Sequence, residues 1–109
     1  MTEIVYYIDI DNTICKSEGN DYKNSQPLAN RINKINALFE AGHTIIYWTA
    51  RGSKTGIDWS EFTSEQLDNW GCKYHMVLFK KPSYDIWIDD KAINSEDFFA
   101  DAYEDISDR

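Results

Sequence analysis

The sequence has few of the features that mark secreted or membrane proteins. Its 109 residues include two cysteines, Cys15 and Cys72, whose separation fits no metal-ligand motif. We therefore expect free thiols in a reducing cytoplasm rather than a disulfide framework. No apolar run is long enough to cross a bilayer, and Glu3 interrupts the start of the chain where a signal peptide would need an apolar segment.

Basic residues are also scarce. Eleven lysines and arginines face 19 aspartates and glutamates, which gives a net charge of -8. This balance argues against a general nucleic-acid or membrane-surface binder. An anionic substrate would have to be held locally by a metal ion and a few placed cations. A hydrophobic content of 42% and an aromatic content of 15% are typical of a globular protein. We find no repeat or linker and expect one domain over residues 1–109.

The most informative stretch is an apolar run that ends in paired carboxylates. Residues 4–8 are apolar or aromatic with strong strand preference, and Asp9, Asp11 and Thr13 follow at alternate positions. Such a run suits a strand covered on both faces of a parallel sheet. Its carboxyl end is where open α/β sheets bind ligands. Two adjacent carboxylates repel unless a cation or a proton separates them, so the pair indicates a reactive or metal-binding site.

Two other acidic motifs fit poorly. A calcium loop starting at Asp9 would need Gly at its sixth position and Glu at its twelfth, where this chain has Ile14 and Asn20. A phospho-receiver domain would need an acceptor aspartate after a later strand. The corresponding position here, after residues 45–48, is Thr49. We therefore set both interpretations aside.

The rest of the chain alternates between predicted helices and strands. The predicted elements are a flap over 15–26, a helix from Pro27 to a stop at Gly42, a strand over 44–48, a helix over 59–70, strands over 76–79 and 85–88, and a helix opening at Ser95 and carrying Phe98, Phe99 and Tyr103. Right-handed parallel units of this kind predict one sheet. We expect the strand order 76–79, 44–48, 4–8, 85–88.

Each predicted strand ends in a residue type that suits phosphate or metal chemistry. In chain order these are Asp9 with Asp11, Thr49, Lys80 with Lys81, and Asp89 with Asp90. In a parallel sheet these ends share one edge. The set, in this order, resembles the four motifs of the haloacid dehalogenase superfamily of aspartate-nucleophile phosphotransferases. The resemblance extends from Ile4 to about Phe99.

The resemblance implies a three-layer, Rossmann-like α/β fold and a magnesium-dependent phosphatase. Asp9 would attack phosphorus to give an aspartyl-phosphate, and Asp11 would protonate the leaving oxygen and later activate water. Mg²⁺ prefers oxygen ligands. The implied metal ligands are Asp9, the carbonyl of Asp11, Asp89 and, directly or through water, Asp90. The implied phosphate-binding residues are Ile10, Thr49, Ala50 and Lys81.

Some assignments stay open at this point. The resembling families often place the lysine before a proline, which favours Lys81 over Lys80. Arg51 could contact a second anionic group of the substrate, or pair with a neighbouring carboxylate. His43 and His75 lie near strand beginnings, away from the expected site, and we assign them structural roles.

The chain departs from the larger superfamily members in two ways. It has no room for a cap domain, so the site would be open to solvent. Only the six residues 80–85 lead from the end of the third predicted strand into the fourth, whereas parallel strands usually need a crossover of a dozen or more. The crossover helix is therefore missing. We expect a second subunit to close the uncovered sheet face, in a homo-oligomer such as a dimer or tetramer.

Thr49-Ala50-Arg51, Lys81-Pro82 and residues 85–92 look most like small capless phosphatases of capsule or surface-polysaccharide biosynthesis. This similarity suggests a sugar phosphate or related small phosphomonoester as substrate. A nucleotide or polynucleotide-end phosphatase is one alternative, although the acidic charge argues against nucleic acid. A non-catalytic regulator that binds a phosphorylated ligand or metal is another. No membrane partner is expected.

Overall fold

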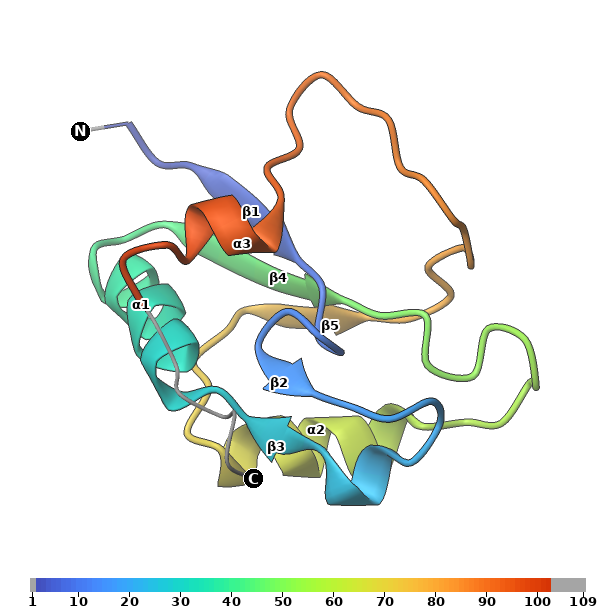
Figure 1. Ribbon diagram of the computed structural model, residues 1–109. Helices are drawn as coiled ribbons and strands as arrows, with labels where there is room; N and C mark the ends of the chain where they lie inside the picture. The colour runs from blue at the N-terminus through green and yellow to red at the C-terminus, as the bar shows by residue number, and fades with distance from the viewer. Residues whose placement is uncertain (1, 103–109) are drawn as a thin grey trace.

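The computed structural model describes residues 2–102 and shows a small α/β domain (Figure 1). Its elements are, in order, β1 (Val5–Ile8), β2 (Cys15–Lys16), the 3₁₀ helix η1 (Tyr22–Asn24), β3 (Gln26–Pro27), α1 (Ala29–Glu40), β4 (Thr44–Trp48), α2 (Ser60–Asn69), β5 (Met76–Leu78) and α3 (Ser95–Phe98). Within these residues, no helix has the length and apolar character needed to cross a membrane.

The main sheet has three parallel strands in the order β1-β4-β5. Val5 pairs with Thr44, and Ile46 pairs with Met76. The chain steps in one direction across the sheet, so two right-handed crossovers place α1 and α2 on the same face. The predicted order of the first three strands is confirmed.

The hydrophobic core lies between that face of the sheet and the helices. Ile45 and Tyr47 of β4 are fully buried, and they form one cluster with Ile35 of α1 and Leu67 of α2. Phe99, directly after α3, joins the same cluster. Side chains on a strand alternate between faces, so the core-facing positions of β1 are Tyr6 and Ile8. The helices therefore hold the sheet from one side.

The opposite face is largely open. Val5 is 55% exposed, Tyr7 60% and Met76 51%. The expectation that residues 4–8 are covered on both faces is therefore wrong, and so is the predicted third layer, for the part of the chain that is described. The reason is the absence of a crossover helix after β5, as the short 80–85 connection predicts.

The predicted fourth strand is not formed. Residues 85–88 lie in a long irregular segment between β5 and α3, which Figure 1 shows projecting from the body of the domain. Ile86 is 78% exposed and Ile88 93% exposed. The apolar pattern predicts a strand here, but within residues 2–102 this segment pairs with no edge of the sheet.

Smaller differences concern element boundaries. Residues 15–26 form a flap as expected, but β2 and β3 pair as an antiparallel ribbon with Cys15 opposite Pro27. Pro27 therefore belongs to the ribbon, and α1 begins two residues later at Ala29. The N-cap residue of α3 is Asn94, whose side chain accepts a hydrogen bond from the Glu96 amide at 2.8 Å. The predicted position of Tyr103 in the last helix lies outside the described residues.

Both histidines have structural roles, as predicted. Nδ1 of His43 accepts a hydrogen bond from the Ile4 amide, and Nδ1 of His75 accepts one from the Ile45 amide, each at 3.1 Å. Each imidazole thus satisfies a backbone donor at the start of a neighbouring strand.

Candidate active site

A pocket of about 340 Å³ lies at the carboxyl ends of β1 and β4. Asp9 follows β1 and Thr49 follows β4, and both line the pocket. Lys81 follows β5, and its Nζ lies 3.8 Å from Oδ1 of Asp9. The structure therefore brings together three of the four predicted strand ends. This is the position at which open parallel sheets bind ligands.

Asp9 lines the pocket, with 38% of its side chain exposed. Burial raises the pKa of Asp9 above its ordinary value of 3.8, and this effect outweighs the lowering by Lys81 and by the hydrogen bond from the Ile10 amide. The Thr13 hydroxyl lies 3.5 Å from Oδ2. The surroundings of Asp9 therefore stabilise its ionised form less than water does.

A tight turn after β1 positions Asp11 beside Asp9. The amides of Thr13 and Ile14 donate to the Ile10 carbonyl at 3.1 and 3.0 Å. Asn12 occupies the left-handed region with φ 62°, which asparagine tolerates better than most residues. Its side chain accepts a hydrogen bond from the Ser17 amide at 3.1 Å, which ties the turn to the flap.

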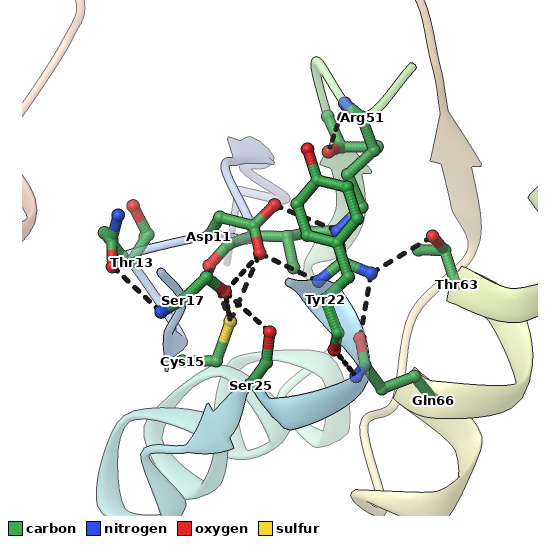
Figure 2. Close-up of polar contacts among 12 residues, drawn as sticks. Asp11, Thr13, Cys15, Ser17, Tyr22, Ser25, Arg51, Thr63 and Gln66 are labelled. Atoms are coloured by element: carbon green, nitrogen blue, oxygen red, sulfur yellow. Dashed lines mark hydrogen bonds and ion pairs between the residues drawn. The ribbon is translucent and has the colours of Figure 1, made fainter. Parts of the chain in front are cut away.

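Arg51 holds Asp11 in a two-point ion pair (Figure 2). Its Nε and Nη2 donate to the two Asp11 oxygens at 2.9 and 2.8 Å, and its side chain is fully buried. Nη1 donates to Thr63 and Gln66 on α2, at 3.2 and 2.8 Å. The guanidinium also stacks on Tyr22, 4.4 Å from the ring centre.

In this conformation Arg51 therefore pairs with a neighbouring carboxylate, which is one of the two alternatives that the sequence leaves open. Its donors are directed at protein acceptors, so contact with a second anionic group of a substrate stays a prediction that would require the pair to open. Asp11 also accepts a hydrogen bond from Ser17 Oγ at 2.6 Å. These contacts fix the orientation of the Asp11 carboxylate.

Thr49 and Ala50 supply donors at the end of β4. The Thr49 side chain is buried, and its hydroxyl accepts a hydrogen bond from the Arg51 amide at 3.1 Å, which leaves the hydroxyl proton available. Within residues 2–102, no acceptor is bonded to the Ala50 amide. The loop closes tightly here: Gly52 has φ +81°, and a Cβ at this position would lie 2.1 Å from the Ile57 carbonyl oxygen.

Lys81, rather than Lys80, lies beside Asp9. The Lys81 amide donates to the Thr49 carbonyl at 3.2 Å, and Ser53 Oγ donates to the Lys81 carbonyl at 2.8 Å. Its ammonium group lies 5.4–5.8 Å from three aromatic rings, those of Trp48, Tyr84 and Trp87. Lys80 is exposed and has φ 65°. The backbone turn at Lys80 directs its neighbour inward.

The predicted metal ligands are only partly assembled. Asp9 and Asp11 are adjacent, but Asp89 and Asp90 are exposed on the irregular segment and do not line the pocket. Among the described residues, no three acidic, histidine or cysteine side chains are grouped so as to hold a metal ion. Asp9, with its raised pKa, and the Asp11 carbonyl fit an oxygen-seeking cation, and an additional carboxylate would be needed to complete the set.

One side of the pocket is aromatic, and its residue Tyr22 has no sequence signal that marks it as part of a site. Tyr22 from the flap and Trp59 before α2 line it, with ring centres 4.9 Å apart in an edge-to-face contact. Gln66 fixes Tyr22 by donating to its carbonyl at 2.7 Å. No sequence motif marks this pairing, because it depends on how the flap folds back over α2.

Comparison with known proteins supports the fold. No family model matches the chain, and no curated protein matches it. The chain is similar to the crystal structure of an MCSG target from Vibrio cholerae, with a TM-score of 0.79 and 25% identity over 87% of this chain and 86% of that chain. The α/β arrangement of this domain is therefore shared with a solved structure over most of both chains.

Proposed function

We propose that this protein is a magnesium-dependent phosphomonoester hydrolase with the Rossmann-like core of the haloacid dehalogenase superfamily. The observation that carries the proposal is the convergence of Asp9 and Thr49 at one pocket, with Lys81 Nζ 3.8 Å from Oδ1 of Asp9. These residues come from three separate strand ends. Together they offer a nucleophile and two donors for phosphoryl oxygens, which is what phosphoryl transfer requires.

In the first half-reaction an Asp9 carboxylate oxygen bonds to phosphorus while the bond from phosphorus to the leaving oxygen breaks. Asp11 gives its proton to that oxygen. In the second, water attacks the aspartyl-phosphate, Asp11 takes the water proton, and phosphate leaves as the bond to Asp9 breaks. The Thr49 hydroxyl, the Ala50 amide and Lys81 stabilise the phosphoryl oxygens, with the Ile10 amide beside Asp9.

Two features of the site condition this chemistry. Asp11 must release Arg51 before it can carry a proton, because both of its oxygens are engaged. A bound Mg²⁺ would neutralise negative charge between Asp9 and the phosphoryl group. Asp9 and the Asp11 carbonyl would hold it, together with Asp89 and Asp90 if their segment is brought to the pocket.

The pocket suits a small substrate with a polar, ring-shaped leaving group. Its volume of about 340 Å³ is modest, and Tyr22 and Trp59 form an aromatic wall. A sugar phosphate fits this combination, since the phosphate would bind near Asp9 and the sugar could pack on an aromatic ring.

The test is hydrolysis of an aryl phosphate by the purified protein with millimolar Mg²⁺, alongside Asp9→Asn. We expect phosphate release that requires Mg²⁺ and is lost in Asp9→Asn, whose amide cannot form the acyl phosphate. A panel of phosphorylated sugars and nucleotides then identifies the leaving group. Binding of phosphorylated ligands without turnover would instead indicate a non-catalytic role.

A further inference from the structure

The main sheet has two edge strands, β1 and β5, among the described residues. Within residues 2–102, β1 pairs with β4 and has no strand on its other side. On the open face of the sheet, the β1 residues Val5 and Tyr7 are also more than half exposed. An exposed edge strand is a template for pairing with another segment, and proteins usually cover or block it.

Residues 82–94, between Lys81 and α3, pair with no strand in the described part of the chain. We call this segment the arm. Residues 85–88 of the arm have a strand-forming pattern, and Ile86, Ile88 and Ile93 are 78%, 93% and 67% exposed. Apolar side chains exposed together in this way mark an interaction site.

The arm cannot reach the β1 edge of its own chain. Lys81 is held beside Thr49 by the 3.2 Å backbone hydrogen bond, on the β5 side of β4. A fourth strand beside the outer edge of β1 would begin level with Val5. That point lies about 22 Å from Lys81, because it is displaced by three strand spacings of about 4.8 Å across the sheet and by five residues of about 3.3 Å along it. Four residue steps from Lys81 to Asp85 span at most about 14 Å.

We propose that residues 85–88 of each copy add as a parallel fourth strand to the β1 edge of a second copy, in a reciprocal dimer. With Asp89 level with Asp9, Trp87 lies opposite Tyr7 of the partner subunit. Ile86 and Ile88 then enter the core-facing side of that sheet, and Trp87 packs on its open face. Reciprocal pairing has the closed two-fold symmetry of most homodimers.

The exchange would also bring to the pocket the additional carboxylates that a metal site needs. Asp89 and Asp90 of one copy would stand beside Asp9 and Asp11 of the other, so that each site is made by two chains. This consequence rests on the proposed function, whereas the strand exchange rests only on the free edge, the exposed arm and the reach.

Cysteine cross-linking tests the exchange without reference to activity. Tyr7→Cys and Trp87→Cys are made separately, co-expressed, oxidised and run on a non-reducing gel. We expect a covalent dimer from the mixture and none from either variant alone, because Cys15 and Cys72 are buried. A double variant carries both new cysteines on one chain. If it forms a disulfide within the monomer, or no disulfide at all, the proposal is overturned.

Light scattering gives the matching mass. The wild type should be a dimer or a multiple of one, and Ile88→Asp should dissociate it. Ile57→Asp changes an isoleucine that is 55% exposed outside the arm and should leave the mass unchanged. A monomeric wild type would refute the exchange.

Complementation tests the shared site. Asp9→Asn and Asp89→Asn are each expected to be inactive. Co-expression should restore about a quarter of wild-type activity, because half of the dimers are mixed and each carries one intact site. No recovery would mean that each site is built from one chain. A wild type inactive on every phosphomonoester would refute the proposed function, while the cross-linking result would still decide the exchange.

Discussion

Arg51 and Asp11 form a partly buried pair in which one guanidinium binds both oxygens of one carboxylate, at 2.9 and 2.8 Å. The two residues are 40 positions apart in sequence and belong to the loops after β4 and β1. The same guanidinium reaches Thr63 and Gln66 on α2 and stacks on Tyr22 of the flap. One side chain therefore links the turn after β1, the flap and a helix.

Arg51→Met should destabilise the fold by about 3 kcal/mol, because it leaves Asp11 partly buried without its cation. Urea unfolding at pH 7 measures this effect. Lys73→Met is the matched control, since Lys73 pairs with Glu40 on the surface and exposed pairs contribute little. Equal effects of the two substitutions would show that the Arg51 contacts are not stabilising.

Lys81→Ala should lower kcat/KM on a phosphomonoester by about 100-fold, the usual effect of removing one charge-stabilising donor. Lys80→Ala changes the adjacent lysine, which is exposed, and should leave kcat/KM within about twofold of wild type. Steady-state kinetics with saturating Mg²⁺ compare the two. A larger loss in Lys80→Ala would reverse the assignment.

Asp9→Asn should raise the thermal midpoint at pH 7. Burial raises the pKa of Asp9, so its stabilising contribution is present below the unfolded value near 3.8 and is lost as pH rises through the folded value. Asparagine does not ionise and avoids this loss. The gain should disappear below about pH 3.8.

Asp58→Asn is the opposing control, because hydrogen bonds from the Ser60 hydroxyl and amide lower the pKa of Asp58. It should lower the midpoint at pH 7. Thermal scans of both variants between pH 3 and 7 give the comparison, and a destabilised Asp9→Asn would show that the pairing with Lys81 dominates.

The two thiols should be unreactive in the folded protein. Burial raises the pKa of Cys15 from 9.0 to about 11 and that of Cys72 to about 12, so both stay protonated at pH 8. Iodoacetamide labelling followed by mass spectrometry should be slow in buffer and fast in urea. Because the unfolded thiols ionise first, stability should fall from about pH 9 upward, and less steeply in a Cys15→Ala, Cys72→Ala variant.

Sequence patterns predicted the parts of the fold that depend on local periodicity. The apolar runs at 4–8, 44–48 and 76–79 became β1, β4 and β5, and the helical spacing before Gly42 and Gly71 became α1 and α2. The convergence of Asp9, Thr49 and Lys81 follows from parallel strand order alone. These features require no knowledge of side-chain packing.

The features that sequence patterns do not predict depend on contacts between distant segments. Residues 85–88 carry the same kind of pattern as the other strands, yet strand formation also needs an edge within reach, and Lys81 is fixed at the wrong end of the sheet. The partner of Arg51 was left open because any of several carboxylates could have taken it. Tyr22 enters the site through the fold of the flap, which has no periodic signal.

The stacking of Arg51 on Tyr22 has a kinetic consequence. If a molecule enters by lifting the flap, the ring leaves the guanidinium as it does so, and the grip on Asp11 loosens in the same movement. Entry to the pocket and release of Asp11 would then be a single event, so that under the proposed function Asp11 could carry a proton only once a molecule has entered.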